Sequence, residues 1–325
     1  MTAGASTTEP PKATPGGPSP EAPASETRAA AAPTPRATGL LDRLTDRQLG
    51  WLVFVCALFL YLPFAGTYGL WDPWETHYAE VARQMTKRGD FISLWWPGSP
   101  RDQDVFWSKP VLTFWLMSLG MHVARVGLRG GPPGEMALTW KAEWAVRVPM
   151  CLLGALAIWS VYWVVARFVS RRAGVLSAIV LATSPMWSLI ARQAMTDMPF
   201  VGPMTLALAC AAMALFDDED VELPRRSASF AKRLSWPHHP LFYTAVGVFL
   251  VTVVPQLIVD SIQLKVTIPW RGREQRMYGA VVMIPYWLGT IGVLLLAARA
   301  RWKAPLYLGI AAVMCGLAVL AKGLA

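Results

Sequence analysis

Three carboxylates stand at the ends of long apolar stretches of the chain. Asp72 and Glu75 follow the first stretch, in GLWDPWETHYAEVARQMTKRGDF, and Asp197 lies between two later ones, in RQAMTDMPF. A carboxylate held beside a hydroxyl can act as a general base. An ionisable group at the edge of hydrocarbon is costly enough that a functional role is the default interpretation. The same acids also suit the first turn of a helix, where the dipole favours negative charge, so a structural role is the alternative.

The segment around Asp72 has the marks of a helix N-terminus. Asp72 at the cap, Pro73 at the first helical position and Glu75 two residues later predict a capping box, and Gly89 can end the helix. The predicted apolar face consists of Tyr78, Val81, Ala82 and Met85. We expect this amphipathic helix to lie flat on the outer surface of a membrane.

The elements around these residues are apolar enough to lie in a membrane. The chain has 325 residues, of which 54% are hydrophobic and 16% are charged, a balance unlike that of soluble domains. Seven uncharged stretches reach the about 18 to 20 residues that a helix needs to cross a bilayer. They are residues 48–70, 148–166, 173–191, 198–216, 241–259, 277–298 and 304–321. The predicted fold class is therefore all-α, a polytopic transmembrane helical bundle with about seven spans.

Basic residues predict the side of the membrane on which each loop lies. Lys and Arg in short loops are retained in the cytoplasm, and most of them fall on that side when the N terminus is cytoplasmic. The segment 71–147 is then an extracytoplasmic loop, on the same side as Asp197. The apolar run 110–124 is too short to cross the membrane, and we interpret it as a second interfacial helix.

The N-terminal tail, the cysteines and the net charge bear on the domain organisation and on the expected partners. Residues 1–38 are rich in Pro, Ala, Thr, Ser and Gly, which predicts a disordered cytoplasmic tail before a transmembrane domain at 39–325. We expect that domain to be incomplete at its C terminus. The four cysteines fall inside predicted spans without metal or disulfide spacing. The net charge of +9 comes largely from basic clusters at loop ends, so nucleic acid is not an expected partner.

Five motifs in order resemble those of a known family. They are ETHYAEVARQM from Glu75, GDF from Gly89, FWSKPVLTFW from Phe106, WAVRVPM from Trp144 and TDMPF from Thr196. In order and spacing they resemble the N-terminal part of type C, membrane-embedded glycosyltransferases of the aminoarabinose transferase and protein O-mannosyltransferase (dolichyl-phosphate-mannose-protein mannosyltransferase-like) kind. The similar region covers about residues 45–215, and GLAVLAKG near the end resembles a further family segment.

The resemblance implies transfer of a sugar from a polyprenyl phosphate carrier to a lipid or protein hydroxyl, in the outer half of the inner membrane. A general base must accept the proton of that hydroxyl, and the resemblance gives this role to Asp72, with Glu75 as its rival and Asp197 as a further catalytic acid. A cation stabilises the charge on the departing phosphate. Lys109 matches the family's phosphate-contacting lysine, and Arg147 is a second candidate.

Two departures from the family pattern bear on the site. Trp74 stands where the first acid of the family's pair is expected. Ser108 replaces the glutamate that precedes the family's lysine, which weakens the case for a divalent metal without removing it. No metal ligand is assigned, and no cofactor is certain. Two alternatives stay open: a noncatalytic envelope assembly protein that keeps the fold, and a transporter, which would need polar residues near the middle of its spans.

Overall fold

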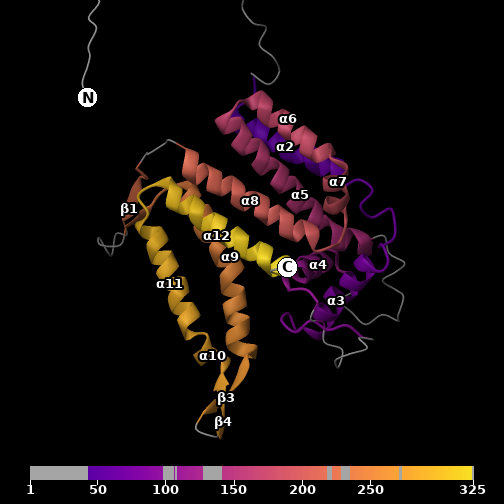
Figure 1. Cartoon of the computed structure of the whole chain (residues 1–325), viewed down its shortest axis with the longest axis vertical. Helices are drawn as coiled ribbons and strands as arrows, with labels where there is room; N and C mark the ends of the chain where they lie inside the picture. The colour runs from indigo at the N-terminus through magenta and orange to yellow at the C-terminus, as the bar shows by residue number, and fades with distance from the viewer. Residues whose placement is uncertain are drawn as a thin grey trace, which may run out of the picture. The chain divides into compact units, whose positions relative to one another are not determined.

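The structure is mostly helical, as the sequence predicts. The computed structural model describes residues 43–97, 106, 108–126, 141–217, 222–227, 235–270 and 273–323. Its helices, shown in Figure 1, are α2 (Asp46–Tyr61), α3 (Trp74–Arg88), α4 (Leu112–Ala124), α5 (Lys141–Phe168), α6 (Arg171–Thr183), α7 (Pro185–Arg192), α8 (Asp197–Phe216), α9 (Pro240–Gln263), α10 (Gly279–Val282), α11 (Ile284–Arg299) and α12 (Lys303–Lys322). Its strands are β1 (Arg225–Ser227), β2 (Ser235–Pro237), β3 (Lys265–Trp270) and β4 (Arg273–Tyr278).

Four of the helices, α5, α8, α9 and α12, are long and apolar enough to cross a membrane. Helices α6 and α7 pass the same test only as a pair, and they are bent by 66° at the break between them. Helices α2 and α11 have 16 residues each, which is about 24 Å at 1.5 Å per residue. Four or five of the seven predicted spans therefore have the length and composition that crossing requires, and the others stay predictions.

The bend between α6 and α7 follows from the local sequence. Pro185 takes the first position of α7, where its missing N–H costs nothing. Its ring disfavours helical backbone at the preceding residue, and Ser184 accordingly has φ −60° and ψ 127°. The predicted span at 173–191 is thus two helices, α6 and α7, that point in different directions.

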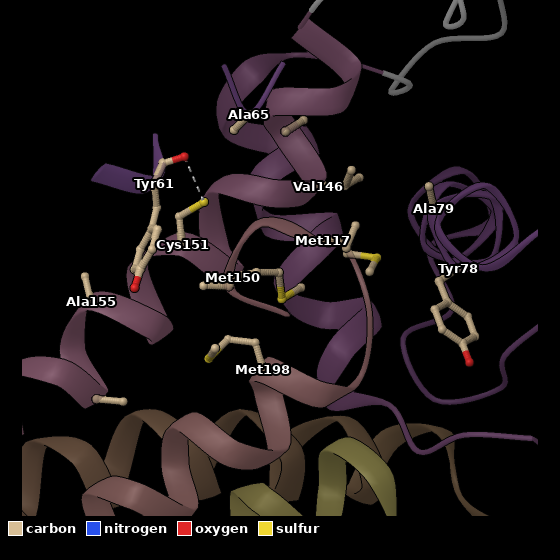
Figure 2. Packing of buried hydrophobic residues seen from close by; sticks show 14 of the residues in the cluster. Tyr61, Ala65, Tyr78, Ala79, Met117, Val146, Met150, Cys151, Ala155 and Met198 are labelled. Atoms are coloured by element: carbon tan, nitrogen blue, oxygen red, sulfur yellow. Dashed lines mark hydrogen bonds between the residues drawn. The ribbon is translucent and has the colours of Figure 1, made fainter. Parts of the chain in front are cut away.

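Helix α5 is central to the packing, since it contacts α2, α4, α6 and α8. Figure 2 shows Met117, Met150 and Met198, which come from α4, α5 and α8 and lie in one buried cluster. Small residues let these helices approach closely. A Cβ added at Gly120 of α4 would lie 1.8 Å from the carbonyl oxygen of Ala145 in α5, so no larger residue fits there without moving a helix.

Helices α8 and α12 lie side by side (Figure 1). The ion pair between Asp197 at the start of α8 and Lys322 at the end of α12 shows that the two helices run in opposite directions. Two ionisable residues that are far apart in sequence therefore meet at one end of the bundle.

The apolar face predicted for α3 is confirmed. Tyr78, Val81, Ala82 and Met85 are all buried, and Gly89 ends the helix with φ 65°. This face packs in the protein core, and Thr86 forms a hydroxyl contact of 2.5 Å with Ser118 of α4. The apolar side of α3 is therefore covered by α4 and the core, and the position of this helix at the membrane surface stays a prediction.

Two short antiparallel hairpins interrupt the helices, and the all-α prediction did not include them. Strand β3 pairs with β4 in a register that places Lys265 opposite Tyr278, and β1 pairs with β2. The segment KVTIPW of β3 is rich in β-branched residues, which favour strands. The longer hairpin, β3–β4, connects α9 to α10, and α11 follows. Few residues of α9 and α11 are buried.

Candidate functional site

Glu75, in the first turn of α3, is a fully buried carboxylate with both oxygens occupied. Its side chain forms an ion pair with Arg147 of α5, and the Oε2 to Nη2 distance is 2.6 Å. Oε1 accepts from Arg147 Nε at 2.9 Å and from the backbone N–H of Ala194 at 2.6 Å. Oε2 also accepts from the backbone N–H of Trp71 at 2.8 Å. Glu75 therefore joins α3, α5, the first loop and the segment after α7.

Arg147 is also fully buried, and every N–H of its guanidinium has an acceptor. Nη1 donates to the carbonyl oxygens of Ala65 and Tyr68, at 2.8 Å each, and Nη2 donates to that of Gly69 at 2.8 Å. With the two bonds to Glu75, all five donors of the group are used. The guanidinium carbon also lies 4.0 Å from the centre of the Tyr68 ring. Arg147 thus positions the first loop and has no donor left for a phosphate, which argues against the donor-binding role suggested by the resemblance.

Asp72 is exposed at the turn before α3, and it does not form the predicted capping box. The cap residue of α3 is Pro73, with no side-chain bond to the backbone. The Thr76 hydroxyl donates to Asp72 Oδ1 at 2.9 Å, while Glu75 reaches back to the N–H of Trp71. The capping prediction is wrong because Glu75 is drawn into the buried pair with Arg147. Within the described part of the chain, only Oδ1 of Asp72 accepts a hydrogen bond.

A cleft of about 700 Å³ opens between the first loop and α7. It is lined by Tyr68, Gly69, Leu70, Trp71, Asp72, Glu75, Pro185, Ser188, Leu189, Arg192 and Gln193. One wall is the loop that the Glu75–Arg147 pair holds, and the other is the helix that Pro185 turns aside. The cleft therefore combines apolar side chains with one exposed carboxylate and one guanidinium.

The guanidinium of the cleft belongs to Arg192, which the sequence analysis did not identify as a site residue. Its Nη2 donates to the carbonyl oxygen of Leu60, and its buried Nε has no hydrogen-bond partner among the described residues. The Tyr68 hydroxyl donates to the Arg192 carbonyl oxygen at 3.4 Å. A basic residue at the end of an apolar stretch was the available signal, but the sequence analysis used it only for topology.

Asp197 belongs to a second polar group, and it does not line the cleft. Its Oδ1 lies 2.7 Å from Nζ of Lys322, and about a third of each side chain is exposed (31% and 35%). Burial, and then the charge of Asp197, raise the pKa of Tyr78 in α3, so the phenol lies in the field of this carboxylate. Lys322 was missed as a single residue, although its segment GLAVLAKG contributed to the resemblance.

Lys109 is half-buried just before α4, and it also lies outside the cleft lining. Its neighbour Pro110 is close to the end of α12, since a Cβ at Gly323 would lie 3.7 Å from Pro110 Cγ. The part of the chain that the structure describes gives Lys109 no ion pair. The predicted residues thus form two sets: Asp72, Glu75 and Arg147 at the cleft, and Asp197 and Lys109 near the end of α12.

Among the described residues, no three His, Cys, Asp or Glu side chains come close enough together to hold a metal ion. The four cysteines are free thiols.

The fold and the cleft define a multi-pass helical membrane protein with a partly polar site beside its apolar helices. Residues 134–222 match the family model described as dolichyl-phosphate-mannose-protein mannosyltransferase. The chain is 29% identical over 166 residues to undecaprenyl phosphate-alpha-4-amino-4-deoxy-L-arabinose arabinosyl transferase of Pectobacterium atrosepticum, which is 50% of this chain and 26% of that enzyme. It is also 29% identical over 158 residues to an uncharacterized protein of Aquifex aeolicus, which is 48% of this chain and 28% of that protein.

Among solved structures, the chain is similar to ArnT from Cupriavidus metallidurans bound to undecaprenyl phosphate. That likeness has a TM-score of 0.44 and 21% identity, over 83% of this chain and 41% of the other. The chain spans about a quarter of the length of the curated relatives that it matches. The family match and the curated relatives confirm the resemblance that the five motifs indicate, to glycosyltransferases that use lipid-linked sugar donors.

Proposed function

We propose that this protein transfers a sugar from a polyprenyl phosphate carrier to a hydroxyl of a lipid or protein, on the extracytoplasmic side of the inner membrane. The observation that carries the proposal is the cleft of about 700 Å³, in which the exposed carboxylate of Asp72 stands among apolar walls. The transferase of Pectobacterium atrosepticum is named for an undecaprenyl phosphate donor, and this supports the class of carrier. The cytoplasmic N terminus and the seven spans belong to the same proposal.

In the proposed reaction, the acceptor hydroxyl attacks the anomeric carbon of the donor sugar. A bond forms between that oxygen and the anomeric carbon, and the bond from the carbon to the phosphate oxygen breaks. The hydroxyl proton passes to a general base, and the carrier leaves as a phosphate with added negative charge. A nearby cation stabilises this charge where water is excluded.

Asp72 is the proposed base, and the geometry favours it over Glu75. Glu75 is fully buried and its two oxygens accept four hydrogen bonds, so protonating it would break the contacts that hold the loop. Asp72 is exposed in the cleft, and only its Oδ1 accepts a described bond, from Thr76. Asp72 also lies on the loop that Arg147 anchors, which restricts the position of the carboxylate.

Asp197 and Lys109 keep their proposed roles from the resemblance, as a second acid and as a contact for the donor phosphate. The Lys322 ammonium holds Asp197 in place. Arg147 becomes a positioning residue, since all of its donors are used within the protein.

The test compares envelope lipids and proteins by mass spectrometry in cells that carry the gene, lack it, or express a variant. We expect a gene-dependent gain of one sugar mass on the acceptor, and a loss of about a hundredfold or more in transfer by Asp72→Asn, the scale of general base catalysis. The matched control is Asp90→Asn, because Asp90 accepts backbone bonds in a turn away from the cleft. Full transfer by Asp72→Asn would contradict the assignment of the base.

The second candidate function is a noncatalytic envelope assembly protein, and one observation favours it. Asp197 and Lys109 do not line the cleft that contains Asp72. If the folded protein produces no sugar increment on any envelope lipid or protein, this second candidate replaces the first.

A further inference from the structure

Arg192 is a cation held in place inside the cleft with part of its donor capacity unused. It lies in the last turn of α7 and lines the cleft together with Asp72. One end of the guanidinium is fixed by the bond from Nη2 to the Leu60 carbonyl oxygen, and the buried Nε has no acceptor among the described residues.

Other arginines in the described part of the chain are engaged differently. Arg147 uses all its donors on Glu75 and three carbonyl oxygens, and Arg83 pairs with Glu80. Arg192 pairs with no carboxylate among the described residues, although Asp72 and Glu75 line the same cleft. An anion that enters the cleft would therefore meet a guanidinium that forms no ion pair with the described residues.

The rest of the lining indicates what kind of molecule carries that anion. Leu70, Trp71, Pro185 and Leu189 are apolar. On the outside of α7, Met186 and Leu189 are exposed by 68% and 47%, so the apolar surface continues from the cleft to the face of the helix. A small, fully hydrated anion gains nothing from these walls, whereas a phosphate attached to a hydrocarbon chain gains from both the charge and the apolar contact.

We propose that Arg192 binds the phosphate group of a phosphate-bearing lipid through the N–H groups of its terminal nitrogens that donate to no described residue. The planar guanidinium can donate two parallel bonds to phosphate oxygens, which a lysine cannot do. This inference rests on the proposed function, under which the lipid is the polyprenyl phosphate carrier. Within the cleft the phosphate contact is then Arg192, because Lys109 does not line the cleft. Arg192 and Asp72 would then act on the two sides of the bond that breaks, the phosphate and the attacking hydroxyl.

The test measures equilibrium binding of lipids to the detergent-solubilised full chain by native mass spectrometry. Four probes are titrated: a short-chain polyprenyl phosphate, the matching polyprenol, inorganic phosphate, and a phosphorylated acceptor lipid such as lipid A. For Arg192→Gln we expect affinity for polyprenyl phosphate to fall about ten- to a hundredfold, the scale of lost charge-assisted bonds. Affinity for polyprenol should not change. The affinity of Arg192→Lys for polyprenyl phosphate should lie between those of the wild type and Arg192→Gln, since lysine keeps the charge and loses the paired donors.

The controls separate this site from folding and from the sugar-transfer reaction. Retained polyprenol binding shows that the cleft of Arg192→Gln is intact, and Arg226→Gln removes an exposed charge of β1 as a matched change outside the cleft. Because no sugar is transferred in the measurement, the result does not depend on catalysis. Wild-type affinity of Arg192→Gln for polyprenyl phosphate would overturn the proposal. A loss confined to lipid A would overturn the assignment to the carrier.

Discussion

Glu75 and Arg147 are the charged residues on which the position of the cleft depends most directly. Both are fully buried, and together they accept from or donate to the backbone at residues 65–71 and at Ala194. Breaking a buried ion pair costs more than the pair contributes, because the remaining charge stays buried without a partner. The first loop, with Asp72 on it, is therefore held by an interaction that tolerates little change.

We predict that Glu75→Gln lowers the free energy of unfolding by about 3–5 kcal/mol, since it leaves the Arg147 charge unpaired. The measurement is thermal or denaturant unfolding of the purified protein in detergent. Glu80→Gln is the matched control, because its partner Arg83 lies in the same helix and both side chains are partly exposed (29% and 26%). That control should cost about 0–1 kcal/mol. Equal effects of the two variants would contradict the role of Glu75 as an anchor.

Helices α4 and α5 show how an element is positioned by the absence of a side chain. Gly120 faces the carbonyl oxygen of Ala145 at a distance that admits no Cβ. The contact sets how deeply α4 enters the core, and α4 in turn covers the apolar face of α3. Helix α3 carries Glu75, so the packing of α4 on α5 helps to fix the position of Glu75.

Gly120→Ala should therefore destabilise the protein by about 1–3 kcal/mol through overpacking. Gly247→Ala, in helix α9, meets nothing within 4 Å, and alanine there should be neutral or stabilise by up to about 1 kcal/mol through helix propensity. Both changes add one methyl group to a helix, so differential unfolding of the two variants isolates the contact. A stabilising effect of Gly120→Ala would show that α4 approaches α5 less closely.

On the scale of the whole molecule, the antiparallel path of α8 and α12 gathers polar residues at one end of the bundle. Asp197 and Lys322 meet there, and Ala194, three residues before Asp197, donates to Glu75. The cleft and the Asp197–Lys322 pair thus lie at the two ends of one short segment between α7 and α8. Under the proposed topology this end faces the outside of the cell.

The topology is testable by labelling single cysteines in a variant that lacks the four native ones. We expect a membrane-impermeant maleimide to react in intact cells with Ser93→Cys, which is exposed after α3, and not with Arg226→Cys, which is exposed in β1. Permeabilised cells should label both. Labelling of Arg226→Cys alone in intact cells would invert the orientation and remove the extracytoplasmic site.

The amino-acid sequence alone determined the features that depend on near neighbours in the chain. The apolar stretches, the buried face of α3 and its end at Gly89 all follow from residue type and spacing, because helix periodicity and solvation act over a few residues. The break at Pro185 is of the same local kind, although the sequence analysis treated 173–191 as one span.

Only the tertiary structure decided which polar side chains meet. Glu75 and Arg147 are 72 positions apart, and Asp197 and Lys322 are 125 apart, so no local pattern specifies either pair. The same holds for Arg192, which is a topology marker in the sequence and a cleft cation in the fold. The reason is physical: in apolar surroundings each buried charge takes the partner that helix packing brings within reach, and that packing depends on contacts along the entire chain.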